Sequence, residues 1–186
     1  MPRRADGDEH GGGVETSVLV TFASRFGSTK AIAERIAATI EAKGHVVDLR
    51  PADKAGVIDD YGAFVIGSSV EAGHWQSAAT GFAERNREVL LLRPVWLFSS
   101  GPLGDHAADA PQPDPTEVAT LRYELAIRDH RVFAGSYDRA TADFSGMGLA
   151  ERVLVRRLMP TGDWRDWPAI EAWAREIADE LAAPTG

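Results

Sequence analysis

Short, almost wholly apolar runs that alternate with helical patterns constrain this chain more than any other feature of its sequence. Residues 63–67 (AFVIG) and 94–98 (PVWLF) have the composition of strands in a parallel sheet that helices cover on both faces. Three further β-rich runs lie at residues 17–22, 45–49 and 131–136. Five strands separated by helical segments predict an α/β fold: a five-stranded parallel sheet in the order 2-1-3-4-5, with helices on both faces.

The segments between these runs carry apolar residues at the spacing of one helix face. Ile32, Ile36 and Ile40 recur every four residues, and Gly44 stands where a helix end is expected. Three more helices are predicted, over residues 77–91, 117–128 and 167–181. Because crossovers between parallel strands are right-handed, the loops that follow the strands meet at one edge of the sheet.

Charge and residue usage exclude several classes of function. The chain has 186 residues, with 28 acidic against 20 basic side chains and a net charge of −8, whereas extended nucleic-acid binding needs a basic surface. It contains no cysteine, which excludes disulfides, thiolate catalysis and Cys-ligated metal centres. The histidines show no metal-ligand spacing, so no metal site is predicted.

The amino-terminal segment differs in composition from the rest of the chain. Residues 1–13 are polar, end in three glycines and lack the apolar centre of a secretory signal. We predict a flexible tail over residues 1–16 and one domain over residues 17–183. Since no apolar run approaches the roughly 20 residues that span a bilayer, the expected location is the cytoplasm.

The loop after the first strand has the features of a phosphate-binding site. It leads into a helix, whose first N–H groups and positive dipole end attract anions. The glycine allows close approach of the backbone, and the hydroxyls are further donors. The alternative is that a hydroxyl only caps the helix. The candidate binding residues are Ser24, Arg25, Phe26, Gly27, Ser28 and Thr29.

The loop after the third strand combines small residues with large ring side chains, which could stack on a planar ligand. For Trp75 the alternative is a hydrophobic anchor for the next helix. His74 is the candidate for proton relay, since imidazole titrates near neutrality, and the alternative is that it only hydrogen-bonds within the loop. The candidate binding residues are Ser68, Ser69, Val70, Gly73, His74 and Trp75.

The loop after the fourth strand is made of small residues that leave backbone groups free to reach the polar edge of a ligand. An ordinary turn is the alternative. The candidate binding residues are Ser99, Ser100, Gly101, Pro102, Leu103 and Gly104.

These motifs resemble a known family. Residues 21–29 (TFASRFGST) are similar to the phosphate loop of flavodoxins, Ser/Thr-x-x-Gly-x-Thr. Residues 67–74 (GSSVEAGH) match the Gly-x-Ser-x-x-x-Gly-His pattern of flavodoxin-domain proteins of the menaquinone-dependent protoporphyrinogen oxidase (dehydrogenase) type. The pair Asp166-Trp167 and residues 174–178 resemble the terminal helix of that subgroup, so the resemblance extends from residue 17 to residue 181.

The resemblance implies bound FMN, with its phosphate on the first loop and its ring between the other two. It implies an oxidoreductase or an electron-transfer protein, either of which passes electrons to a redox partner protein or a quinone. An acidic surrounding disfavours anionic reduced flavin. The stretch between the fifth strand and the last helix, residues 137–166, is shorter than the corresponding insertion of the resembled enzymes, which puts porphyrin and quinone specificity in doubt.

Residues 149–159 also have a pattern of their own. Arg152, Arg156 and Arg157 stand among apolar residues, as in amphipathic segments that contact a membrane, a quinone or an anionic porphyrin. A packed helix with solvated arginines is the alternative.

Two other functions fit the predicted fold. An NAD(P)H-dependent FMN or quinone reductase shares the topology, although its usual Pro-Glu-Tyr segment is replaced here by residues 68–73. A flavin-free binding module is the other, because Phe26 stands close to the predicted phosphate position.

Overall fold

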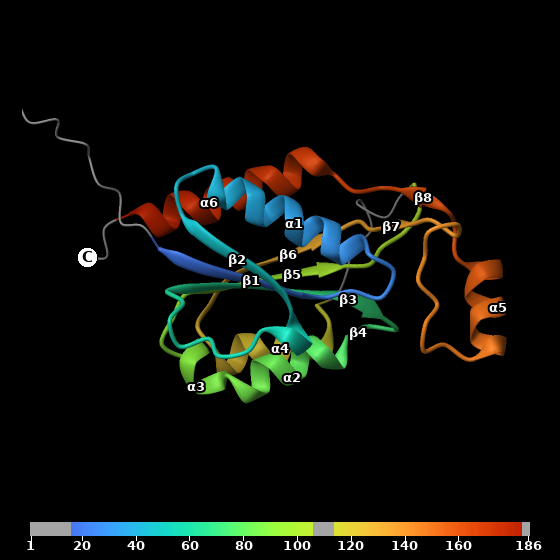
Figure 1. Ribbon diagram of the computed structural model, residues 1–186, viewed down its shortest axis with the longest axis horizontal. Coiled ribbons are helices and arrows are strands. Elements are labelled where there is room, and N and C mark those ends of the chain that lie inside the picture. Colours follow the sequence, from blue (N-terminus) through green and yellow to red (C-terminus); the bar gives the residue numbers. More distant parts are fainter. Residues whose placement is uncertain (1–15, 106–113, 184–186) are drawn as a thin grey trace, which may run out of the picture.

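A parallel five-stranded sheet forms the centre of the molecule. The computed structural model describes residues 16–105 and 114–183. The strands β1 (Ser17–Ala23), β2 (Val46–Pro51), β3 (Ala63–Glu71), β5 (Val95–Ser100) and β6 (Ile127–Phe133) lie in the order β2-β1-β3-β5-β6. In chain order this is 2-1-3-4-5, so the predicted topology is confirmed (Figure 1). A two-residue strand, β4 (His74–Trp75), pairs antiparallel with the end of β3.

Helices cover both faces of this sheet. Helices α1 (Ser28–Glu41) and α6 (Trp167–Ala182) lie on one face (Figure 1). The other face carries the short turn η1 (Ala52–Lys54) and three helices, α2 (Ser77–Arg85), α3 (Arg87–Leu90) and α4 (Thr116–Glu124).

Alternation along the strands builds a separate apolar core on each face. In β5, Trp96 and Phe98 pack in the core under α1 and α6, whereas Val95 and Leu97 pack in the core under α2 and α4. The isoleucines predicted to share one face of α1 are fully buried against the sheet. Burial on both faces explains why these strands are almost wholly apolar.

Two helix predictions were wrong at their boundaries. The helix predicted over residues 77–91 is divided at Asn86, whose side-chain amide donates to the Phe82 carbonyl at 2.8 Å. Asparagine competes in this way with the helix backbone. The helix predicted over residues 117–128 ends at Glu124, because Leu125 turns to an extended conformation and packs in the core.

The last sheet strand, β6, begins earlier than predicted. It begins at Ile127 rather than Arg131 and ends at Phe133 rather than Ser136, since parallel pairing with β5 fixes its register. Arg128 and Arg131 leave this strand with little apolar alternation, so composition alone did not reveal its start.

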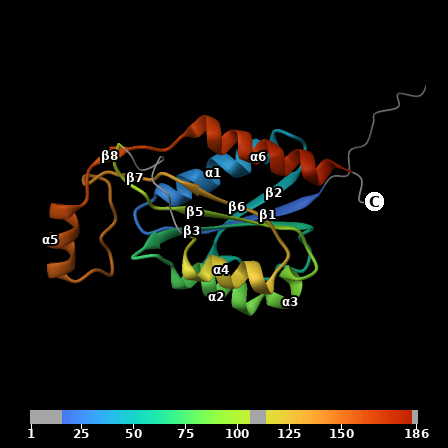
Figure 2. The same cartoon turned by 180° about the vertical axis from the view of Figure 1, so that it is seen from behind.

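A small ribbon carries a further helix beyond the sheet. Strands β7 (Ser136–Tyr137) and β8 (Gly162–Asp163) pair antiparallel, and α5 (Leu149–Leu158) lies in the segment between them. Figures 1 and 2 show α5 projecting at the end of the molecule where the sheet strands finish. Residues 1–15 of the predicted tail lie outside the described residues. Within the described ranges, no helix is long and apolar enough to cross a membrane.

Candidate functional site

The turn between β1 and α1 points the first turn of the helix at a cavity. Gly27 has φ 88°, and its N–H donates to the Ser24 hydroxyl at 3.1 Å. The Gly27 carbonyl accepts the N–H of Ala31 at 3.1 Å, which starts the helix. A Cβ at position 27 would meet no atom within 4 Å, so glycine is required here by the left-handed backbone rather than by crowding.

The three predicted loops meet around this cavity, which has a volume of about 290 Å³. It lies at the carboxyl edge of the sheet, where β1, β3 and β5 end. More than half of the predicted site residues line it: Ser24, Arg25, Phe26, Ser28, Thr29, Ser69, Val70, Ser100, Gly101 and Leu103.

The other predicted site residues do not line this cavity. They are Gly27, Ser68, Gly73, His74, Trp75, Ser99, Pro102 and Gly104. Trp75 is only 5% exposed and packs in the core beside α2, as its anchoring alternative proposed. The exposed ring of His74 contacts a carboxylate oxygen of Glu117 at 2.9 Å, away from the cavity.

The backbone of the third loop is less free than predicted. The Gly101 N–H donates to the Phe133 carbonyl at 3.4 Å, and the Pro102 carbonyl accepts the N–H of Gly135 at 2.9 Å. These bonds fasten the loop to the chain that follows β6. The Gly101 N–H and the Pro102 carbonyl are therefore already hydrogen-bonded within the protein.

Sequence reasoning missed six residues that also line the cavity: Glu71, Gly135, Ser136, Glu151, Val155 and Met159. The chain after β6 contributes Gly135 and Ser136, and the Ser136 N–H donates to the Ser28 hydroxyl at 2.9 Å. A Cβ at Gly135 would come within 3.2 Å of Leu103. The end of a fourth strand at the same edge is a signal that could have identified these two residues.

Two hydroxyl groups at the cavity have no hydrogen-bond partner among the described residues. Thr29 is 1% exposed, and its Oγ1 is one of them; the other is the Oγ of Ser69. Buried hydroxyls are normally hydrogen-bonded, so each is a donor that a bound polar group can use. The N–H groups of residues 28–30, in the first turn of α1, also have no acceptor within the helix.

Arg25 provides a positive charge at the cavity wall. Its guanidinium pairs with the carboxylates of Glu71, at the end of β3, and Glu151, on α5. Partial burial lowers the pKa of Arg25, but the hydrogen bonds and charges of Glu151 and Glu71 outweigh it and leave the pKa above its ordinary value. The same residue links the phosphate-loop candidate to α5.

Phe26 fastens the first loop to the chain that carries α5. Its ring meets that of Tyr137 edge-on, with 5.3 Å between centroids, and that of Phe144 at 6.0 Å. Edge contacts of this kind are favourable between aromatic rings. Phe26 thus anchors the first loop at the cavity wall. Its side chain offers no polar donor to a ligand.

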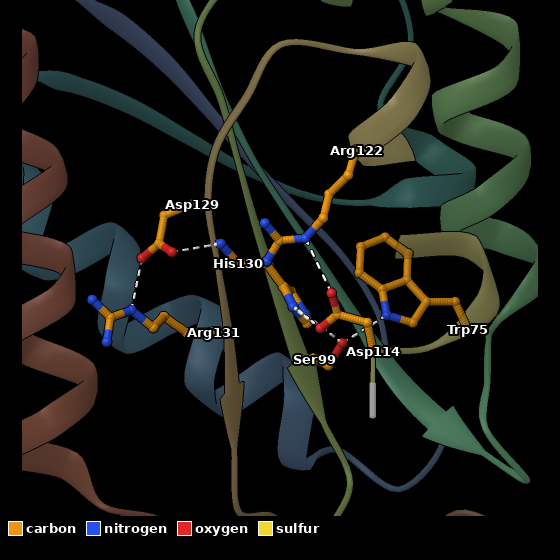
Figure 3. A network of polar contacts seen from close by, with 7 residues as sticks. All are labelled: Trp75, Ser99, Asp114, Arg122, Asp129, His130 and Arg131. Carbon is orange, nitrogen blue, oxygen red and sulfur yellow. Dashed lines mark hydrogen bonds and ion pairs between the residues drawn. The ribbon is translucent and has the colours of Figure 1, made fainter. Parts of the chain in front are cut away.

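A polar network that is buried at Trp75, Ser99 and His130 and exposed at Asp114 and Arg122 lies beneath the second and third loops (Figure 3). The Trp75 indole donates to the Ser99 Oγ at 2.8 Å, and that oxygen lies 2.9 Å from Nε2 of His130. Nδ1 of His130 lies 2.9 Å from a carboxylate oxygen of Asp114, which also pairs with Arg122 at 3.1 Å. The network connects β4, β5 and β6.

The order Ser99, His130, Asp114 is that of a nucleophile triad, but the environment is different. Ser99 is 0% exposed, and its hydroxyl already accepts a hydrogen bond from Trp75. Burial lowers the pKa of His130 more strongly than Asp114 raises it. We assign these residues to the support of the loops rather than to chemistry.

Comparisons with known proteins agree with this geometry. A family model described as a flavodoxin domain matches residues 19–163. No curated protein matches the chain significantly.

Solved structures match at low sequence identity. A flavodoxin from the domain Archaea aligns with TM-score 0.54 and 16% identity, covering 90% of this chain and 99% of that one. A cysteine-to-serine mutant of a flavodoxin from Pseudomonas aeruginosa gives TM-score 0.55 and 15% identity, covering 90% and 99%. Oxidised Flavodoxin 1 from Bacillus cereus gives TM-score 0.58 and 12% identity, covering 88% and 98%. At such identities these matches establish the fold.

Proposed function

Because the chain belongs to the flavodoxin domain family, we propose that it binds FMN at the carboxyl edge of its sheet and transfers electrons. One observation carries the proposal. The first turn of a helix and the hydroxyls of Thr29 and Ser69, which have no partner among the described residues, converge on a cavity walled by all three predicted loops. Free donors and a positive dipole end are what a phosphate monoester requires.

The phosphate fits the donors of the first loop. The N–H groups of residues 28–30 and the Thr29 hydroxyl are without acceptors in the described part of the chain. The Ser24 hydroxyl accepts the Gly27 N–H, so its own proton remains available for donation, whereas the Ser28 hydroxyl accepts the Ser136 N–H and also lies 3.5 Å from the Ser100 hydroxyl. Arg25 lies at the same wall, but its charge is already paired with Glu71 and Glu151, so the phosphate depends on the N–H and hydroxyl donors.

The apolar part of the cavity suits a flat ring system. Val70 and Leu103 line it from the second and third loops, and Ser69, whose hydroxyl has no partner among the described residues, lines the same cavity. FMN supplies both one-electron and two-electron chemistry when bound. The protein's part is to orient the ring, exclude water and set the charge around it.

Titration of the apoprotein with FMN tests this proposal. We expect quenching of FMN fluorescence with a saturable affinity, and much weaker binding of riboflavin, which lacks the phosphate. Thr29→Val removes one donor to a charged group at nearly constant volume, which should weaken FMN binding at least about tenfold. Thr39→Val, on the exposed side of the same helix, is the matched control.

The proposal fails if FMN does not bind, or if riboflavin binds as tightly as FMN. Equal affinity of the two threonine variants would reject the phosphate position without rejecting the cofactor.

We also propose a narrower function, that of an oxidoreductase of the protoporphyrinogen-dehydrogenase type with a quinone as acceptor. It is supported by the pattern of residues 67–74 and by Val155 and Met159, which add apolar surface to the cavity from α5 and the residue that follows it. Anaerobic reoxidation of the reduced protein by menadione, with and without protoporphyrinogen as donor, tests it. Reoxidation by a protein acceptor alone would favour a simple electron carrier.

A further inference from the structure

Helix α5 exposes more aliphatic side chains than any other helix in the described part of the chain. None of its residues is buried, and its large aliphatic side chains on the outer side are 56–78% exposed. They are Leu149, Val153, Leu154 and Leu158. An isolated helix of this length is marginal in water, and aliphatic side chains on its open side give it no stabilising contact there.

The two sides of α5 have different environments. Val155 and Met159 line the cavity, and Arg152 donates to the Phe144 carbonyl at 3.1 Å, so these residues mark the side that meets the protein. At helical spacing, Leu149 and Val153 form one exposed row and Leu154 and Leu158 form a second, and the two rows flank Arg157, which stands opposite the side that meets the protein. The outward side is therefore an aliphatic surface of two rows.

The charge of α5 is opposite to that of the whole chain. Three arginines, at positions 152, 156 and 157, stand against one glutamate, Glu151, which is already paired with Arg25. The chain as a whole carries a net charge of −8. Arg157 lies between the aliphatic rows, and Arg156 stacks over the Phe144 ring at 4.8 Å. An occupant of this surface must offer both apolar contact and negative charge.

We propose that α5 docks on an anionic lipid surface. A bilayer interface provides acyl chains at the depth of the leucines and phosphates at the depth of the guanidinium groups, which long arginine stems can reach. Because α5 projects at the end of the molecule (Figures 1 and 2), it meets a flat surface before the rest of the sheet does. The cavity, which α5 helps to line, then lies beside that surface.

Sedimentation of the full chain with vesicles tests the proposal. We expect binding to vesicles of phosphatidylcholine with phosphatidylglycerol, weak binding to phosphatidylcholine alone, and loss of binding as salt screens the charges. Leu154→Ser with Leu158→Ser should weaken binding at least about tenfold. Arg156→Gln and Arg157→Gln should each weaken it about fivefold.

The matched control carries the same chemical changes elsewhere. Leu92 is 75% exposed and precedes β5, at the end of the sheet where the strands begin. Leu92→Ser with Arg93→Gln should leave vesicle binding unchanged. None of the substituted α5 residues lines the cavity, so FMN affinity should also be unchanged, which separates this test from that of the proposed function.

Four results would overturn the proposal. Binding could be absent from anionic vesicles, or equal for neutral and anionic vesicles, or equally reduced by the control variant. Concentration-dependent self-association that Leu154→Ser abolishes would instead make a second copy of the chain the occupant, and would overturn the lipid proposal as well.

Discussion

Two glycines of the site motifs are present for different physical reasons. Gly27 adopts a left-handed conformation with open space around it, whereas a Cβ at Gly67 would lie 2.0 Å from the ring of Phe98. Glycine is therefore required at position 27 by the backbone conformation, and at position 67 by close packing between β3 and β5. A motif that looks wholly functional in sequence thus contains at least one position fixed by the core.

Gly27→Ala should destabilise the protein by about 1 kcal/mol, since a residue with a Cβ is strained at this φ. FMN affinity should fall too, because the relaxed turn no longer directs the first N–H groups of α1 at one point. Chemical denaturation and FMN titration measure the two effects. Gly148→Ala is the control: its φ is −63° and a Cβ there meets nothing, so neither quantity should change.

Protonation of His130 should destabilise the protein. Its folded pKa is below the ordinary value of about 6.5 because the ring is buried, so the unfolded chain binds a proton more readily. The stability that neutral His130 contributes is fully present above the unfolded pKa of about 6.5. It is lost as the pH falls from there through the folded pKa.

His130→Gln makes this dependence measurable. The difference in free energy of unfolding between the protein and this variant should shrink between about pH 7.5 and about pH 5.5. Chemical denaturation at several pH values gives the difference, and a constant difference across this range would contradict the assignment.

Helix α5 depends on few contacts, all of them near the cavity. Glu151 pairs with Arg25 of the first loop, and Arg152 and Arg156 contact Phe144. Elements with little buried surface open more readily than the core. We therefore expect α5 to open more readily than the sheet and the helices that cover it.

Glu151→Gln should loosen α5 without changing global stability. The pair is partly exposed and contributes little, so amide exchange within residues 149–158 should rise about two- to fivefold. Hydrogen exchange measures this directly, together with the temperature of unfolding. Glu34→Gln, which removes an exposed pair with Lys30 on α1, should leave exchange in α5 unchanged. Unchanged exchange in both variants would show that the aromatic contacts alone hold the helix.

Elements with strong periodicity could be predicted from sequence, and those defined by tertiary contacts could not. The buried strands and α1 carry their own pattern, and the three loops follow from the order of the strands. Glu151 reaches the cavity from α5, a distant segment that its pair with Arg25 joins to the first loop, and no local pattern encodes this contact. Trp75 was predicted as a possible ring partner, but its indole is taken up by Ser99 in the core.

At the scale of the whole molecule, ligand binding and folding are coupled. The cavity draws its wall from the ends of four sheet strands and from α5, so the ligand contacts segments distant in sequence. A ligand that binds only this arrangement shifts the folding equilibrium by mass action.

FMN should therefore raise the temperature of unfolding. At a free concentration of about 100 times its Kd, it adds about 2.7 kcal/mol, which corresponds to roughly 5–11 °C for a chain of this size. Differential scanning calorimetry measures the shift. Riboflavin at the same concentration should produce a much smaller one, and an equal shift would place the binding energy in the ring rather than the phosphate.

The paired strands β7 and β8 hold together the two ends of the long segment that contains α5. Ser136 pairs with Asp163 and Tyr137 with Gly162, and the Trp164 N–H donates to the Gly135 carbonyl at 3.1 Å. Because the two ends of the segment are already joined, a change in its length costs little loop-closure entropy. The segment between β7 and β8 can therefore be lengthened or replaced while the sheet and its two apolar cores stay unchanged. The same fold can acquire a new binding specificity in this way.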